Sequence, residues 1–217
     1  MANKSPVKNQ TIAVIGAGNW GKNLIRNFSE LNALSALSDK SASVLKEMRK
    51  LYPSCDCYPA LKDILSHPKV KAVVIATPAE THFLLAREAL LSGKHVFVEK
   101  PMTLTEKDAE ELIALADQNH RILMVGHLLQ HHPVFVKLKQ IASAGELGRI
   151  HYIYSHRLNL GKIRREENIL WSFAPHDISM ILALAGEEPE SVLATGGNYL
   201  HKKIADVTTT HLEFSSG

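Results

Sequence analysis

The sequence predicts an α/β protein in which a doubly wound parallel sheet is followed by a partial α+β domain with a mostly antiparallel open sheet. In the first half, short apolar runs alternate with amphipathic stretches of helical period, which is typical of parallel strands joined by crossover helices. From about residue 127 the pattern changes to helices and longer strand-like runs. We therefore expect a first domain over 1–127 and a second, incomplete one over 128–217, which 217 residues can accommodate.

The strands expected in the first half are short apolar runs, because strands of a parallel sheet are buried on both faces. They lie at 11–16, 33–37, 70–77, 95–101 and 121–126. The helices between them are indicated by apolar residues three or four positions apart, as with Leu24, Phe28 and Leu31. The further helices of this half are expected at 41–52, 78–93 and 105–120.

The second half is expected to begin with a helix and then to build a sheet. A helix is predicted at 132–145, a long strand at 148–160, a second helix at 174–186, and strands at 191–200 and 206–214. The chain ends directly after the last strand, so we expect several sheet strands to be absent and an unpaired, apolar edge to be exposed. The chain is then either a fragment or a subunit whose partner supplies the pairing, as in a homo-oligomer joined through this sheet.

Composition narrows the functional class. A net charge of +3 without a basic block favours neither nucleic-acid nor membrane binding. The N-terminal segment lacks the apolar core of a signal peptide, and we expect a cytoplasmic protein. Cys55 and Cys57 are too close in sequence for a strain-free disulfide. We also expect no metal: "CDC" is only half a metal site, and His127, His131 and His132 lack an acidic or cysteine ligand beside them.

A glycine-rich turn follows the first predicted strand and opens the first helix. It reads Gly16-Ala-Gly18-Asn19-Trp20-Gly21, the spacing G-x-G-x-x-G. In this context one glycine makes a tight turn, another lets the backbone approach a pyrophosphate, and the third lets helix and strand pack closely. The sequence therefore predicts a Rossmann domain that binds a dinucleotide through this segment.

The second predicted strand is followed by Asp39, about twenty residues after the glycines. A carboxylate at this position bonds the ribose hydroxyls and repels a 2′-phosphate, so NAD is favoured over NADP. Lys40 and Ser41 come next and are compatible with a phosphate, which keeps NADP open.

Four motifs together give the chain a family resemblance. They are the glycine turn, "ATPAETH" at 76–82, Glu99-Lys100-Pro101 after the fourth strand, and "APHD" at 174–177. The chain resembles the glucose–fructose oxidoreductase, inositol dehydrogenase and MocA family from about residue 10 onward. The resemblance implies that Lys100 lies beside nicotinamide and substrate, that the Lys100–Pro101 peptide is cis, and that Thr77, Pro78, His82 and Glu99 belong to the cofactor site. For His82, a solvent-facing place on the helix is the alternative.

Within that family, the run from Arg157 to Met180 looks like the branch that acts on UDP-N-acetylglucosamine or its uronic acid. This likeness implies oxidation of the sugar 3-hydroxyl, in the synthesis of amino sugars for surface polysaccharides or lipid A variants. It also implies that a basic and polar cluster ahead of "APHD" holds the substrate, since arginines bind diphosphates through two bonds. Its members are Arg157, Asn159, Lys162, Arg164, Arg165 and Asn168, each of which could instead belong to a solvated basic loop. The expected substrate site also includes Lys100, Trp171, Ser172 and His176.

His176 is the candidate base. Oxidation of an alcohol needs a group that takes the hydroxyl proton as the carbon gives up hydride, and neutral histidine suits this near pH 7. Pro175 suits the first position of a helix, so we expect His176 in a first turn, whose partial positive charge disfavours imidazolium. Lys100 would assist by binding the alkoxide. Many family members have aspartate four residues before this histidine, whereas this chain has Ser172.

Three functional classes remain open from the sequence. The first is an NAD-dependent oxidoreductase acting on CH–OH groups of a sugar nucleotide. The second is a dehydrogenase of free polyols such as inositol. The third is a dinucleotide-binding regulator without catalysis, which the presence of both Lys100 and His176 disfavours. Apart from these classes, the alternative is an inactive gene fragment.

Overall fold

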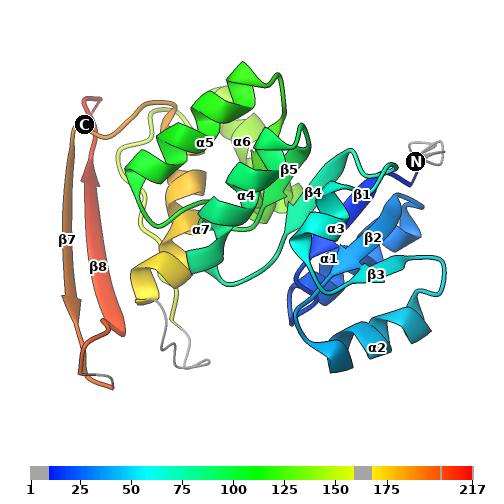
Figure 1. Cartoon of the computed structure of the whole chain (residues 1–217). Coiled ribbons are helices and arrows are strands. Elements are labelled where there is room, and N and C mark those ends of the chain that lie inside the picture. Colours follow the sequence, from blue (N-terminus) through cyan, green and yellow to red (C-terminus); the bar gives the residue numbers. More distant parts are fainter. Residues whose placement is uncertain (1–9, 159–167, 201, 217) are drawn as a thin grey trace. The chain divides into compact units, whose positions relative to one another are not determined.

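The chain folds as two units, His127 being the first residue of the second (Figure 1). The computed structural model describes residues 10–158, 168–200 and 202–216. The first unit is built on a six-stranded parallel sheet in the order β3-β2-β1-β4-β5-β6. Its strands are β1 (Ile12–Ile15), β2 (Leu34–Ser38), β3 (Asp56–Tyr58), β4 (Ala72–Ile75), β5 (His95–Val98) and β6 (Leu123–Val125). The predicted doubly wound sheet is confirmed.

Helices cross between these strands and cover both faces of the sheet. They are α1 (Gly21–Glu30), α2 (Ala42–Leu51), α3 (Leu61–Leu65), η1 (Ala79–Thr81), α4 (His82–Leu91) and α5 (Glu106–Gln118). Neighbouring residues of one strand point to opposite faces, so Val14 packs with α1 and α2, whereas Ala13 and Ile15 pack with α4 and α5. Two apolar cores thus cover the sheet, one on each face. The carboxyl ends of β1 and β4 meet where the strand order reverses.

In its described residues, the second unit contains three helical segments and a hairpin. They are η2 (Leu128–His131), α6 (Pro133–Ser143), α7 (Ile169–Ala185), β7 (Ser191–Gly197) and β8 (Val207–Glu213). The two strands pair antiparallel along their whole length, from Ser191 opposite Glu213 to Gly197 opposite Val207. The predicted antiparallel sheet is therefore present as two strands.

The long strand predicted at 148–160 is wrong over its described part. Residues 148–158 form no strand in the described structure, although their alternation suits one. A strand needs a neighbour to which its backbone can hydrogen-bond, and β8 pairs only with β7 among the described residues. Tyr152 and Tyr154 are consequently 80% and 73% exposed, their rings stacked on each other.

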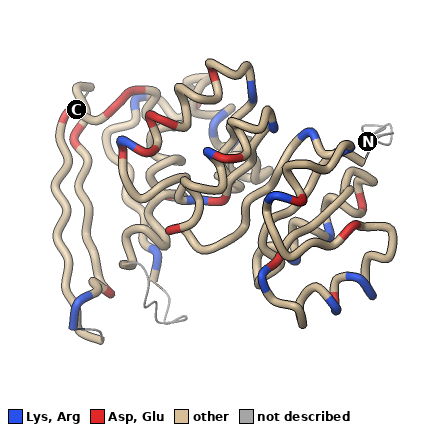
Figure 2. Tube along the Cα trace, in the orientation of Figure 1, with Lys and Arg blue, Asp and Glu red and all other residues tan. Residues whose placement is uncertain are grey.

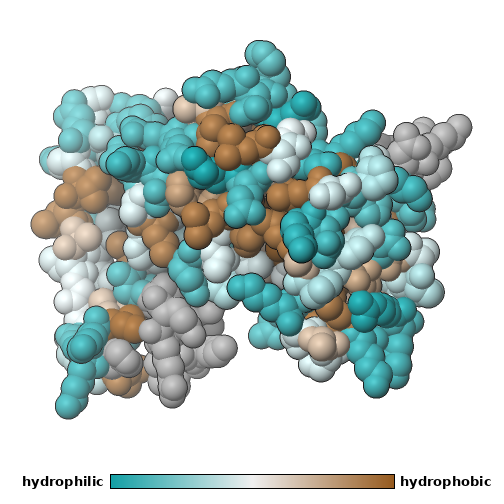
Figure 3. All heavy atoms as spheres, in the orientation of Figure 1, coloured by the Kyte–Doolittle hydropathy of each residue, from teal (hydrophilic) through white to brown (hydrophobic). Residues whose placement is uncertain are grey.

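The hairpin presents apolar side chains to solvent. Val192 and Leu193 are 61% and 65% exposed, and apolar surface shows over β7 in Figure 3. Figure 2 shows that charged residues, frequent on the helices of the first unit, are sparse along both strands. An exposed apolar sheet of this kind agrees with the edge expected from the sequence. Among the described helices, none combines the length and the apolar character needed to cross a membrane.

Candidate functional site

The glycine-rich turn joins β1 to α1, and its three glycines have different surroundings. Gly16 has φ +91°, a left-handed conformation, and a Cβ there would lie 2.8 Å from the carbonyl oxygen of Ala76. A Cβ on Gly21 would lie only 2.0 Å from the carbonyl oxygen of Gly16. A Cβ on Gly18 would meet nothing within 4 Å. The protein itself therefore requires glycine at the two outer positions, whereas the middle position is open toward solvent and toward a ligand.

Asp39 connects the end of β2 to this turn. Its two carboxylate oxygens accept hydrogen bonds from the backbone of Ala17 (2.8 Å) and of Ser41 (2.8 Å). Each oxygen retains a lone pair, so the half-buried carboxylate can still accept bonds from ribose hydroxyls. Asp39 thus holds the glycine turn in place and lies where the sequence predicted the ribose contact.

Trp20 connects the same turn to the end of β5. Its indole N–H donates to the Glu99 carboxylate at 2.7 Å, although the ring is 45% exposed. Glu99 is itself 8% exposed, and burial raises the pKa of its carboxyl group. Hydrogen bonds from Trp20 and from the Lys100 backbone, and the charges of Lys100 and His82, oppose that rise in pKa. The loops after β1 and β5 are therefore joined by a buried carboxylate.

His82 is buried at the start of α4, so the solvent-facing alternative is wrong. Its Nδ1 lies 2.7 Å from the carbonyl oxygen of Pro101, and its Nε2 lies 2.8 Å from that of Thr77. The ring thereby joins the loop after β4 to the loop after β5, where the Lys100–Pro101 peptide is cis, as expected. Within the protein, His82 therefore links two loops. The sequence did not reveal this role, because helical spacing alone does not show which helix residues contact neighbouring loops.

Most of the predicted cofactor residues thus gather at the carboxyl ends of the parallel strands. The turn after β1, Asp39 after β2, Thr77 after β4 and Glu99 after β5 are linked by the contacts above. Ligands of open α/β sheets bind at this edge. Of the other predicted cofactor residues, Asn19 and Pro78 are exposed and Lys100 is half-buried.

Helix α7 carries His176, and it begins at Ile169, six residues before Pro175, the predicted first helical position. Asn168 caps it by accepting a hydrogen bond from the backbone of Trp171 at 3.0 Å. Pro175 lies inside the helix, not at its first position, and removes one backbone donor there. His176 therefore lies beyond the first turn, and the expected influence of the helix start on its ring is wrong, because that field fades within one turn. The apolar run "ILWSFA" is itself helical.

Ser172 and His176 are one helical turn apart and share a face of α7. Ser172 is 2% exposed, whereas His176 is half-buried and Trp171 is 38% exposed. The serine thus occupies the place from which an aspartate would face the histidine, but it brings no charge. Lys100 belongs to the first unit and these residues to the second.

Arg157 does not extend freely toward a ligand. Its guanidinium makes two bonds, of 2.7 and 3.0 Å, to the carboxylate of Asp177 and lies over the ring of Phe173. This hydrogen bonding raises the pKa of Arg157. Ser155 donates to the same carboxylate at 3.1 Å. Asp177, which the sequence did not single out, therefore ties the segment before residue 159 to α7. The predicted substrate residues Asn159, Arg164 and Arg165, with Lys162, lie outside the described residues.

His127 is a second residue whose place the sequence did not reveal. Its ring lies edge-to-face against that of His176, with centroids 6.4 Å apart and planes at 83°. The available signal was its position, directly after β6 and Gly126 at the carboxyl edge of the sheet. Among the described residues, three or more potential ligands do not come together to hold a metal ion.

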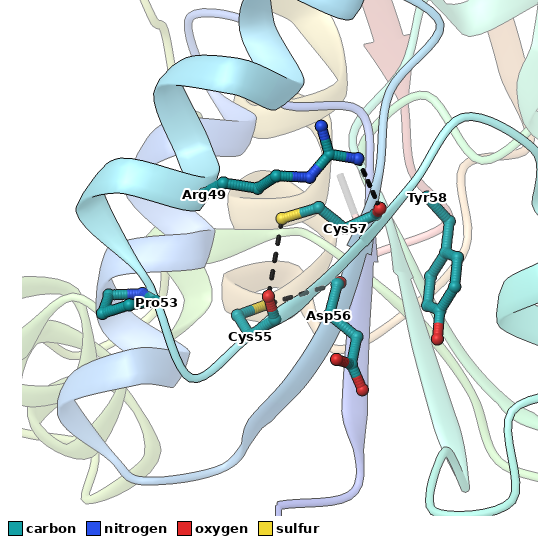
Figure 4. A pocket seen from close by; sticks show the side chains of 6 residues that line it. All are labelled: Arg49, Pro53, Cys55, Asp56, Cys57 and Tyr58. Carbon is teal, nitrogen blue, oxygen red and sulfur yellow. Dashed lines mark hydrogen bonds between the residues drawn. The ribbon is translucent and has the colours of Figure 1, made fainter.

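Two cavities lie apart from His127 and His176, although Arg157 and Asp177 line the second. A cavity of about 420 Å³ lies between α2 and β3, where Arg49 reaches toward Cys57 and donates to its carbonyl oxygen (Figure 4). Both cysteines are free thiols; burial raises the pKa of Cys55 to about 12 and also raises that of Cys57. In the second unit, a cavity of about 1500 Å³ is lined by α7, β8 and the segment before residue 159. His176 does not line it, so this cavity lies on the opposite face of α7.

Comparison with known proteins identifies the family. Residues 10–127 match the oxidoreductase family with an NAD-binding Rossmann fold, and residues 135–217 match the GFO/IDH/MocA C-terminal domain. The chain belongs to the Gfo/Idh/MocA family. Its family resemblance, deduced from four motifs, is thus confirmed.

Named relatives in the Gfo/Idh/MocA family include two dehydrogenases. UDP-N-acetylglucosamine 3-dehydrogenase of Acidithiobacillus ferrooxidans is 32% identical over 94% of this chain and 63% of its own length. Myo-inositol 2-dehydrogenase of Thermotoga maritima is 28% identical over 95% of this chain and 65% of its own. A solved structure of the former matches with a TM-score of 0.86 and 30% identity, covering 96% of this chain and 67% of that one. The chain thus spans less than two thirds of the length of these curated relatives.

Proposed function

We propose that this protein oxidises a hydroxyl group of a sugar nucleotide with NAD, at C3 of a UDP-N-acetylhexosamine or its uronic acid. The observation that carries the proposal is the 32% identity to UDP-N-acetylglucosamine 3-dehydrogenase over 94% of the chain. Lys100 directly after β5 and His176 in α7 supply the two functional groups that such a reaction needs. The dinucleotide would be held by the open position at Gly18, by Asp39 and by the loops after β4 and β5.

The residues have separate tasks in this mechanism. NAD, held by the glycine turn and Asp39, would supply the hydride acceptor for the alcohol carbon. The His176 ring takes the proton of the hydroxyl group as the carbon–oxygen bond becomes a carbonyl. The Lys100 ammonium donates a hydrogen bond to the same oxygen and stabilises its developing negative charge. Asp39 favours NAD over NADP by repelling a 2′-phosphate.

The experiment is substrate-dependent formation of NADH, followed by absorbance, with UDP-N-acetylglucosamine and its uronic acid as substrates. Lys100→Ala and His176→Ala should each reduce kcat by about 10²-fold or more. The NAD affinity of His176→Ala, measured by calorimetry, should be near that of the unsubstituted chain. Formation of NADH that does not depend on either residue would contradict the assigned roles.

Oxidation of a free polyol is the second candidate, favoured by the 28% identity to myo-inositol 2-dehydrogenase. Inositol in the same assay separates the two. Turnover of inositol without turnover of the sugar nucleotides would establish the second candidate. The exposed apolar hairpin of β7 and β8 supports association of this chain with copies of itself. Light scattering would test this by comparing the mass of the unsubstituted chain with that of Leu193→Lys, which should associate less.

A further inference from the structure

A buried carboxylate joins two loops of the first unit. The indole N–H of Trp20, in the turn after β1, donates to the Glu99 carboxylate at 2.7 Å, and the backbone N–H of Lys100 donates to the same carboxylate. A carboxylate that is 8% exposed needs such donors, because burial removes the water that would otherwise solvate its charge. Hydrogen bonds to an ionised group are short and strong, so one charge holds both donors.

Gly126, directly after β6, provides the space in which this carboxylate lies. Its backbone N–H donates to the carbonyl oxygen of Val98, the residue before Glu99, at 2.8 Å. A Cβ on Gly126 would lie 2.9 Å from the Oε1 atom of Glu99 and 3.0 Å from its Cδ and Oε2 atoms. These three atoms form the end of a side chain that can rotate, and none of them belongs to the backbone. A methyl group at this position should therefore displace the carboxylate and leave the strands in place.

The glycine turn is also held by contacts that do not involve Trp20. Asp39 accepts a hydrogen bond from the backbone of Ala17 at 2.8 Å, and Gly16 and Gly21 lie close to neighbouring backbone. The Lys100 backbone, in contrast, is bonded directly to the carboxylate that the indole holds. Loss of the indole bond should consequently disturb Lys100 more than the turn.

We propose that Trp20 is a positioning residue that acts through Glu99: its indole bond sets where the buried carboxylate lies, and the carboxylate sets the backbone of Lys100. Gly126 belongs to the same arrangement, since the absence of a side chain there leaves the carboxylate within reach of both donors. Catalysis depends on such geometry, because a misplacement of about 1 Å can cost about 10²-fold in rate. The catalytic meaning of this inference rests on the proposed function of Lys100, whereas the link from Trp20 to Lys100 does not.

The first test is an NMR titration of the Glu99 carboxyl carbon in ¹³C,¹⁵N-labelled protein without substrate, with Glu99→Gln used to assign the signal. The indole bond stabilises the ionised carboxyl group and so lowers its pKa; in Trp20→Phe, which keeps an aromatic ring without an N–H, the midpoint should move to higher pH. Lys100 and His82 also lower this pKa, but both are present in the variant. Glu47→Gln, which removes an exposed ion pair between α1 and α2, is the matched control and should leave the midpoint unchanged.

The backbone amide signal of Lys100 is the second readout. It should shift in Trp20→Phe and in Gly126→Ala, and it should stay in place in Glu47→Gln. Trp20 is 45% exposed and its replacement keeps a ring, so Trp20→Phe carries the test if Gly126→Ala fails to fold. An unchanged Glu99 midpoint or an unchanged Lys100 signal in Trp20→Phe would overturn the proposal.

Kinetics separate this inference from the proposed function. Trp20→Phe and Gly126→Ala should each lower kcat about tenfold, the effect of one lost charge-assisted hydrogen bond, and should change the KM for NAD much less. The double variant should lose no more than either single variant, because both act on the same carboxylate. An unchanged kcat in both single variants would overturn the positioning role. NMR shifts without NADH formation by the unsubstituted chain would refute the proposed function and leave the link to Lys100; NADH formation without the shifts would do the reverse.

Discussion

Replacing the glycines of the turn one at a time should separate the needs of the fold from those of the cofactor. In Gly21→Ala the new Cβ would lie 2.0 Å from the carbonyl oxygen of Gly16, about 1.4 Å inside an ordinary contact of 3.4 Å. Both atoms belong to buried backbone, so the overlap cannot be relieved by a side-chain rotation. Since overpacking costs about 1–3 kcal/mol and sometimes more, we expect a loss of at least about 3 kcal/mol in the free energy of unfolding.

Gly18→Ala should behave in the opposite way. Its Cβ would meet no atom within 4 Å, and its φ lies outside the left-handed region, so alanine should raise the free energy of unfolding by about 0.4–1 kcal/mol. A methyl group there would, however, keep the backbone from approaching a pyrophosphate. Losing one charge-assisted hydrogen bond costs about 1.5–3 kcal/mol, and the Kd for NAD should therefore rise about tenfold or more.

Urea unfolding followed by circular dichroism, together with calorimetric titration of NAD, measures both quantities on the same samples. The reasoning would be refuted if Gly18→Ala bound NAD as tightly as the unsubstituted chain. It would equally be refuted if Gly18→Ala lost as much stability as Gly21→Ala, because the middle glycine would then serve the fold.

Three further predictions concern charges and thiols. The raised pKa of Glu99 means that the folded chain holds this proton more tightly than the unfolded chain, so the free energy of unfolding should fall as pH rises from about 4.5 through the folded pKa. Glu99→Gln should flatten this fall, measured by urea unfolding from pH 4.5 to 7.5. Parallel plots of unfolding free energy against pH for the two proteins would contradict the prediction. With a pKa of about 12, Cys55 is about one part in ten thousand thiolate at pH 8; a thiol reagent should leave it unmodified in the native chain and modify it readily in urea, whereas rapid native labelling would show that the site opens. A double-mutant cycle of Arg157→Met and Asp177→Asn should give a coupling free energy of about 1 kcal/mol in urea unfolding, and a value near zero would show that the bidentate pair is not stabilising.

The sequence predicts the first unit well because its signals are local. Each buried strand is a short apolar run bounded by polar residues, and the glycine turn is fixed by its place between a strand and a helix. The sequence also predicted that Asp39 would end the second strand, and the structure shows its carboxylate bonded to the turn at Ala17. The sequence did not reveal the bracing role of His82, because two carbonyl oxygens from separate loops meet at this ring only after the sheet has assembled.

The second unit was harder to predict because its signals depend on partners. Residues 148–158 have the alternation of a strand, yet alternation says only that one face is apolar and does not supply a neighbour for the backbone. The start of α7 was misplaced for a related reason. Proline suits the first position of a helix, and that preference outweighed the apolar run before Pro175, although a capping asparagine preceded the run.

The correct start of α7 changes the explanation of how His176 could serve as a base. In the first turn of a helix, the backbone N–H groups would have favoured a neutral His176 ring, and the local sequence would have been enough to explain that neutrality. Eight residues into the helix, that influence is gone. Ser172, one turn earlier, offers no charge, and Asp177 is occupied by Arg157. The ring of His127, from a segment almost fifty residues away in sequence, also contacts the His176 ring. The surroundings of the His176 ring in this unit therefore include tertiary contacts, such as the packing of η2 against α7, which the local sequence does not reveal.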